Sequence, residues 1–344
     1  MLRLISSICT IFCMTDSPRD NPLLLPVSMN SCRSRPIETL NFLPTQTIDQ
    51  KEEKTMKRIL LASTALVMSA GIAAAEPTVG GDGRMGVVST DGGDVKFSSR
   101  VRISFTASGE TDNGLTFGGS IRADNASGGA SGTTGSVHVA GPFGKLAMGD
   151  VDSAAKAAVG HAECVGYTGL GDLNEIKYIG GGNDPSALWN YGMGDLTMYA
   201  SVGNPNYDDA VDNEDVDMSG AVAYSLGDVG FGVGVERRGD MQTVAAGVNA
   251  TLGDASVKLV YGSYDDGMAG TDNVDSYSAS ASFVTGMATF TAFTSGNSKG
   301  VDGQDHFGIG ASYDLGGAKI TGGFVDGDSL ANGASFDLGL TMSF

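Results

Sequence analysis

The 344-residue chain carries 21 Lys and Arg against 40 Asp and Glu, a formal net charge of −19. A chain this acidic is not built to bind nucleic acid through phosphate contacts. Its 52 glycines, 41% apolar content and 7% aromatic content do not indicate a dense, helix-covered core. The length allows one large domain or two ordinary ones.

The first 75 residues differ from the rest of the chain. Residues 1–55 contain several prolines and show no sustained hydrophobic period. Met56-Lys57-Arg58 then opens a basic start, which an apolar run and Ala73-Ala74-Ala75 follow. This order is typical of a secretory signal peptide, and its small-residue end argues against the alternative, a transmembrane helix. We predict that residues 1–55 are a misannotated or disordered extension, 56–75 a signal peptide and 76–344 the exported domain.

The exported domain offers little for catalysis. It holds 13 Lys and Arg and 34 Asp and Glu, a net charge near −21, and one cysteine, Cys164, so no intrachain disulfide can form. Its histidines, His138, His161 and His306, are widely spaced. Nothing specifies the base and the pocket that a reactive thiol needs. We expect no enzymatic activity and no required cofactor.

From Gly80 onwards the dominant hydrophobic period is two. In the last segment, small or polar residues separate Phe336, Leu338, Leu340, Met342 and Phe344. Such alternation is typical of a strand with one apolar and one polar face. Most of the segments are about the 9–11 residues that a tilted strand needs to cross a bilayer. The sixteen predicted strands lie at 81–88, 95–107, 114–124, 134–141, 144–149, 186–192, 195–203, 216–227, 228–238, 241–252, 255–264, 274–284, 287–295, 305–315, 318–326 and 334–344.

The connections between these segments alternate in length. Short turns lie at 141–144, 192–195, 226–228, 252–254, 285–287 and 315–317. Longer, mostly acidic loops lie at 204–217, 265–273, 296–304 and 326–333. Short turns on one side and long loops on the other are the layout of an outer-membrane barrel, and an even strand count places both termini on the periplasmic side.

A soluble β-sandwich is the alternative fold for alternating strands. The polar face, however, carries Arg84, Arg100, Arg102, Arg122, His138, Lys145, Lys258 and Lys319. Burying these unpaired in a dry core would be costly, whereas a water-filled lumen removes the conflict. The other face carries, near strand ends, the aromatic residues that form interfacial girdles in barrels, namely Trp189, Tyr191, Tyr224, Tyr261, Tyr277 and Tyr313. We predict an all-β fold, a 16-stranded antiparallel transmembrane β-barrel.

One connection, residues 150–185, is much longer than the others. Long loops in strand-rich domains are usually functional or disordered. Residues Ser153–Val159 favour a short helix, which we expect Asp152 to cap. We predict that this loop, the third external one, folds into the mouth of the barrel and forms the constriction. The alternative is a surface loop with no role.

Several motifs resemble those of a known family. They are Gly83-Arg84-Met85-Gly86-Val87, Phe97–Arg102, Phe143–Asp150, Ala311–Gly317 and the terminal Phe344. Together they resemble the general diffusion porins of the Rhodobacter type, from purple non-sulphur and related alphaproteobacteria, across 76–344. The resemblance implies a homotrimer whose third external loop lies inside the pore, with passive diffusion of small hydrophilic solutes. It also implies that Phe344 is a recognition signal for the barrel-assembly machinery.

The predicted constriction opposes basic wall residues to an acidic loop. Arg84, Arg100, Arg102 and Arg122 fall on the polar face of the first three strands, and Lys145 on that of the fifth. The loop offers Glu163, Asp172 and Glu175. Opposed charges order water and disfavour apolar solutes, and the overall acidity predicts a weak cation preference. The alternative is that the arginines only pair with neighbouring acids in the wall.

We therefore predict an outer-membrane porin for ions and small hydrophilic solutes, in contact with outer-membrane lipid and lipopolysaccharide. The alternatives are a substrate-selective channel and a structural or adhesive barrel with a blocked lumen. The acidic loops also offer oxygen ligands suited to Ca²⁺ or Mg²⁺, although a merely solvated loop is the simpler reading. The acidic residues of the longest such loop are Asp208, Asp209, Asp212, Glu214, Asp215 and Asp217.

Overall fold

The computed structural model describes residues 76–126, 129–132, 135–180, 186–204, 216–268, 270–298 and 304–344. The chain divides into two units, residues 1–66 and 67–344, and every described residue lies in the second. The predicted extension and signal peptide, residues 1–75, fall outside the described residues, as does most of the acidic loop at 205–215.

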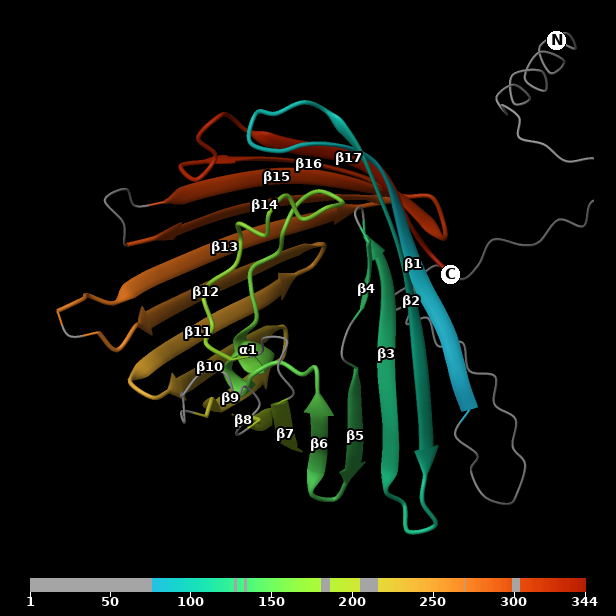
Figure 1. The fold of residues 1–344 in the computed structure, drawn as a ribbon, viewed down its shortest axis with the longest axis vertical. Coiled ribbons are helices and arrows are strands. Elements are labelled where there is room, and N and C mark those ends of the chain that lie inside the picture. Colours follow the sequence, from blue (N-terminus) through green and yellow to red (C-terminus); the bar gives the residue numbers. More distant parts are fainter. Residues whose placement is uncertain are drawn as a thin grey trace, which may run out of the picture. The chain divides into compact units, whose positions relative to one another are not determined.

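The second unit is built almost entirely of antiparallel strands (Figure 1). They are β1 (Glu76–Ser89), β2 (Lys96–Glu110), β3 (Thr116–Ala126), β4 (Gly129–Gly132), β5 (Ser136–Gly141), β6 (Gly144–Gly149), β7 (Ser186–Met193), β8 (Leu196–Gly203), β9 (Met218–Leu226), β10 (Val229–Arg238), β11 (Met241–Leu252), β12 (Ala255–Asp265), β13 (Val274–Thr285), β14 (Ala288–Asn297), β15 (Asp305–Asp314), β16 (Ala318–Gly327) and β17 (Ser335–Ser343). A six-residue helix, α1 (Ala154–Val159), lies between β6 and β7. Among the described residues, no helix is long and apolar enough to cross a membrane.

The sheet closes on itself. Apart from β4 and β5, each strand pairs with its neighbours in the chain. Strand β17 also pairs with β1, so that Arg84 lies opposite Thr341 on one side and Arg100 on the other. The pieces β4 and β5 pair with successive parts of β3 and together occupy one strand position in the wall. The described strands therefore form a closed 16-stranded barrel, which confirms the predicted fold.

Side chains alternate between the two faces of the wall, as the period of two predicts. On β11, Thr243 and Ala245 are fully buried, whereas Val244 between them is 43% exposed. On β13, Ser278 is buried and its neighbour Tyr277 is 46% exposed. Large apolar side chains are exposed on one face all round the ring. That is the pattern expected of a barrel whose outer face contacts lipid.

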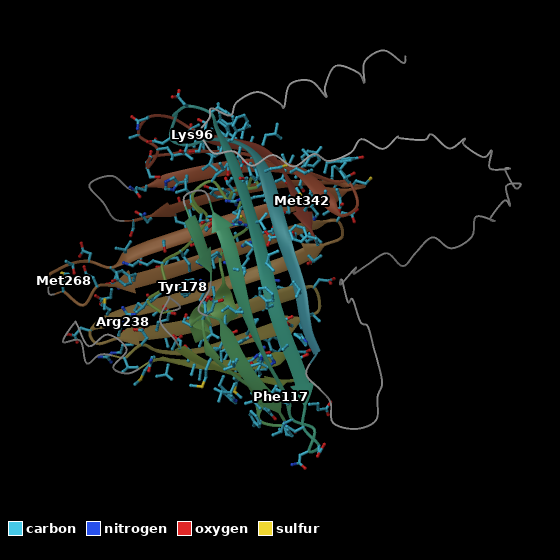
Figure 2. All side chains as sticks on the ribbon, turned by 45° about the vertical axis from the view of Figure 1, so that its right-hand side comes forward. Lys96, Phe117, Tyr178, Arg238, Met268 and Met342 are labelled. Atoms are coloured by element: carbon cyan, nitrogen blue, oxygen red, sulfur yellow. The ribbon has the colours of Figure 1, made fainter. Side chains whose placement is uncertain are left out.

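The turns follow the predicted alternation with one exception. The short turns after β7, β9, β11 and β13 each hold a glycine in the left-handed region, for example Gly253 at φ 66°, which a tight hairpin favours. At the other end of the barrel, β10 and β11 are also joined by only two residues, Gly239 and Asp240. Figure 2 shows Lys96 and Arg238 at strand ends and Met268 in the loop that follows β12.

Candidate pore constriction

The long connection between β6 and β7 is described from residue 151 to 180, and we call this stretch the inner segment. Its helix α1 begins after Ser153, whose Oγ accepts a hydrogen bond from Lys156 N at 3.2 Å. The prediction that Asp152 caps the helix is wrong, because Ser153 holds the extended backbone of a cap residue. Asp152 instead pairs with Lys156 Nζ at 3.0 Å.

The start of α1 docks on β8 and β9. Ala154 N donates to Ser201 Oγ at 2.8 Å, and Ala155 N donates to Ser219 Oγ at 2.9 Å. Wall serines thus satisfy N–H groups that a helix start leaves unpaired. On β10, a Cβ at Gly234 would lie 2.6 Å from Ala155 Cα, so glycine permits this close approach. Figure 1 shows α1 against these strands.

The middle of the inner segment packs on β11 to β16. Its backbone is bound by two serines, with Glu163 N donating to Ser280 Oγ at 2.9 Å and Ser295 Oγ donating to Leu173 O at 2.5 Å. Two apolar clusters accompany these bonds. One joins Val159, Ala162 and Ile176 to Ala245 and Val260, and the other joins Val165 and Leu170 to Phe293 and Val325.

The tip of the inner segment reaches the far side of the ring. Arg84 Nη1 on β1 donates to Tyr167 O at 3.1 Å. Thr168 donates from its backbone N and its Oγ1 to Asp337 Oδ2 on β17, at 2.7 and 2.6 Å. One segment of 30 residues therefore contacts strands from β8 round to β17 and β1. In a closed ring, it can do so only from the face that points to the barrel axis.

The four predicted arginines share this inward face, and two carboxylates lie among them. Arg102 Nε donates to both oxygens of Asp82, at 3.0 and 2.8 Å, and Arg100 Nη2 lies 3.7 Å from the same carboxylate. Arg122 Nε pairs with Asp124 at 2.6 Å. Sequence reasoning had not named Asp82 or Asp124, although each lies two residues from an arginine on the same strand and hence on the same face. The basic cluster and the ion pairs between arginines and neighbouring acids of the wall, which we treated as alternatives, are therefore both present.

The other predicted site residues are dispersed. Lys145 lies far from the arginines along the wall. It is opposite Ala140 on β5, and Ala140 is opposite Thr116 on β3. Thr116 is six positions from Arg122 on the same strand, which is roughly 20 Å. Glu163 accepts a hydrogen bond from Ser282 Oγ on β13 at 2.5 Å. It therefore sits on a different part of the wall from the arginines.

Asp172 and Glu175 are exposed on the inner segment. Asp172 adopts a left-handed backbone at φ 53°, and Glu175 Oε1 lies 3.7 Å from His161 Nε2. Burial raises the pKa of the Glu175 carboxyl, and the nearby Asp172 charge adds to the effect. The same two causes raise the pKa of the Cys164 thiol, which disfavours the reactive thiolate.

His161 is the most perturbed group of the inner segment. Its Nδ1 accepts a hydrogen bond from Ile176 N at 3.3 Å, and its ring packs edge-on against Tyr178. Burial lowers its pKa from 6.5 to about 4, with Lys156 and Lys258 adding like-charge repulsion. His161 is therefore neutral at pH 7.

Metal binding finds no support among the described residues, where no group of three or more His, Cys, Asp or Glu side chains could hold an ion. Asp217, the described member of the acidic loop, forms an ion pair with Arg238. The other acids of that loop lie in the part of the chain that the structure leaves undescribed.

A closed 16-stranded barrel with a polar inward face and an apolar outward face defines a membrane channel. The chain belongs to the Gram-negative porin family, whose model matches residues 62–329. It is 34% identical over 302 residues to a porin of Rhodobacter capsulatus, covering 78% of this chain and all of that one.

Solved structures agree with this assignment. A porin structure refined at 1.8 Å resolution superposes with a TM-score of 0.69 at 30% identity, covering 78% of this chain and all of that chain. A triple mutant of Rhodopseudomonas blastica porin, 22% identical with the same coverage, superposes at 0.63 and shows the likeness of fold. The protein is therefore an outer-membrane general diffusion porin.

Proposed function

We propose that the inner segment is the constriction of this porin, and that it leaves the passage for solutes along the wall formed by β2 to β7. The observation that carries the proposal is the two-sided docking of the segment, from Ser201 on β8 to Asp337 on β17. Its apolar side chains fill the space against β11 to β16. Among the described residues, no hydrogen bond or ion pair joins it to β2, which carries Arg100 and Arg102, or to β3, which carries Arg122.

The proposed passage has charges on both sides. On the wall, four arginines outnumber the two carboxylates Asp82 and Asp124, so the cluster keeps a net positive charge. On the segment, Glu175 is 50% exposed and Asp152 is 52% exposed. Arginine stays charged at any working pH. The transverse field orders water and penalises apolar solutes, and the acidic chain as a whole favours cations weakly.

Reversal potentials in KCl gradients across planar bilayers test this charge arrangement. Replacing both Arg100 and Arg102 by alanine removes two positive charges and should shift selectivity further towards cations. Replacing Glu175 and Asp152 by their amides should shift it towards anions. Lys319 on β16 lies opposite Thr341, which also pairs with Arg84, so Lys319→Ala removes one positive charge two strands from Arg84 and should shift the reversal potential less. Equal reversal potentials for all variants would contradict the proposal.

A substrate-selective channel is the second candidate for the same pore. It requires solute flux that saturates with concentration, whereas passive diffusion requires flux that rises in proportion. A structural or adhesive barrel requires the absence of conductance. We infer from the channel architecture that the protein has no catalytic role.

We further propose export with cleavage after Ala75, on the pattern of residues 56–75. N-terminal sequencing of the outer-membrane protein should begin at Glu76, and residues from before Met56 would contradict this. Phe344 supports the proposed recognition by the barrel-assembly machinery, since its side chain is 60% exposed at the end of the last strand. Lipopolysaccharide contact and Ca²⁺ or Mg²⁺ at the acidic loops stay proposals on composition alone.

We also propose a homotrimer. A shallow groove on β1 to β6 is lined by small and apolar residues such as Ala107, Gly119 and Val137. Small residues let barrel walls approach closely. Native mass measurement should give three chains, and a mass of one chain would contradict this.

A further inference from the structure

Two buried carboxylates of the inward wall bind the backbone of the inner segment. Glu236 on β10 and Asp337 on β17 are 2% and 3% exposed. Glu236 Oε2 accepts a hydrogen bond from Ile179 N at 2.5 Å, and Asp337 Oδ2 accepts two from Thr168. Hydrogen bonds from N–H groups to a carboxylate are stronger than those between neutral groups.

Glu236 lies where the two ends of the inner segment meet. A Cβ at Gly180 would lie 3.2 Å from Ser153 Cβ and 3.9 Å from Glu236 Oε1. The carboxylate thus sits beside both the residue that caps α1 and the last residue of the segment. Binding at this point fixes the base of the segment.

Asp337 lies at the tip. A Cβ at Gly166 would lie 2.4 Å from Asp337 Oδ1, and Gly166 adopts φ 78°, so the approach depends on glycine there. The two carboxylates are seven strands apart in the ring order. They therefore bind the segment at opposite ends of its path across the barrel.

A carboxylate on the wall of a water-filled lumen would normally stay solvated, but Glu236 and Asp337 are buried. Removing an ionised group from water is costly unless donors replace the lost hydration. Here the replacing donors come from the inner segment. We propose that Glu236 and Asp337 are positioning residues for solute passage, which hold the inner segment at its base and its tip and so fix the aperture. This inference rests on the proposed constriction.

The test compares isosteric amide variants with a matched control in planar bilayers. Glu236→Gln and Asp337→Asn remove the charge and leave one acceptor oxygen. Asp314→Asn removes the same charge from β15, where the Asp314 carboxylate accepts one hydrogen bond within the described structure, from Gly316 N of its own turn. We call Glu236→Gln and Asp337→Asn the anchor variants. Each should spend about tenfold more time at altered conductance levels, the factor that corresponds to losing one charge-assisted hydrogen bond. Asp314→Asn should keep the wild-type current record.

A second readout follows the segment directly. Cys164, the only cysteine of the exported domain 76–344, lies on the inner segment and is exposed, so a spin label there reports segment motion. The label should become mobile in Glu236→Gln and Asp337→Asn and stay immobile in Asp314→Asn. Thr168→Val and Thr168→Ser probe the tip without altering the wall. Only the valine variant, which loses the hydroxyl, should free the label.

The two readouts separate the inference from the proposed function. A mobile label with an unchanged current would support the anchors and overturn the constriction. Anchor variants that match Asp314→Asn in both label mobility and current would overturn the anchors. If Asp337→Asn fails to fold, the difference in label mobility between Thr168→Val and Thr168→Ser tests the anchor at Asp337 instead.

Discussion

Arg84 of β1 holds the carbonyl oxygen of Tyr167 at 3.1 Å from its Nη1, and its guanidinium lies 5.8 Å from the centre of the Tyr167 ring. This contact ties the first strand of the barrel to a residue 83 positions later in the chain. Among the hydrogen bonds of the described residues, it is the one that joins an arginine of the cluster to the inner segment. Arg84 both contributes positive charge and binds the tip of the inner segment.

These two roles predict different results for two variants. Arg84→Ala should shift the reversal potential towards cations and also increase current noise, because charge and contact are both lost. Arg84→Lys keeps the charge but lacks the planar fork of donors, so it should keep the wild-type reversal potential with increased noise. The same noise in Arg84→Lys as in wild type would show that the contact with Tyr167 is dispensable.

The close approach of α1 to β10 predicts an effect of a single methyl group. In Gly234→Ala, the new Cβ would overlap Ala155, and overpacking of this kind typically costs 1–3 kcal/mol. We expect α1 to shift into the passage and the single-channel conductance to fall. Gly220 on β9 has nothing within 4 Å of its Cβ position. Gly220→Ala is therefore the control, and a conductance equal in both variants would contradict the docking of α1.

His161 predicts a pH dependence for the docked segment. Its pKa is about 4 when docked and 6.5 when free, so the free segment binds more protons between these values. The stabilisation is fully present above pH 6.5 and is lost as the pH falls to 4, by about 3 kcal/mol at most. Protonation also adds a third positive charge to those of Lys156 and Lys258, while Asp152 and Glu175 offset part of it.

Current records between pH 7 and pH 4 measure this dependence. Wild-type fluctuations should increase on acidification, and His161→Gln, whose amide oxygen can still accept from Ile176 N, should flatten the response. Glu175 acts in the opposite direction because its pKa is raised, but its 50% exposure keeps the effect small. His306→Gln, on β15, serves as the control. An acid response that survives in His161→Gln would exclude His161 as its origin.

Much of the barrel could be predicted from the sequence, because a period of two is a direct consequence of strand geometry. All sixteen strand positions were predicted within a few residues, except that β1 begins at Glu76 rather than near residue 81. Residues 76–82 contain two glycines and do not alternate, so their pairing with β2 depends on the neighbouring strand. The break between β4 and β5 likewise has no periodic signal.

The site was less accessible to sequence reasoning. The inward position of the arginines follows from alternation, and Asp82 and Asp124 could have been found by the same rule. Glu236 and Asp337 could not, because an acid on the polar face of a strand looks the same whether it faces water or a docked segment. Only the path of the inner segment distinguishes them.

If the inner segment sets the aperture of the pore, shortening the segment should widen the pore. His161 and Ile176 lie next to each other, since Ile176 N donates to the His161 ring at 3.3 Å. Residues 162–175 can therefore be replaced by two glycines without straining the chain. Single-channel recording of this variant, with a wild-type circular dichroism spectrum as the check on folding, should give a conductance clearly above that of the full-length porin. A conductance equal to that of the full-length porin would show that the inner segment does not set the aperture.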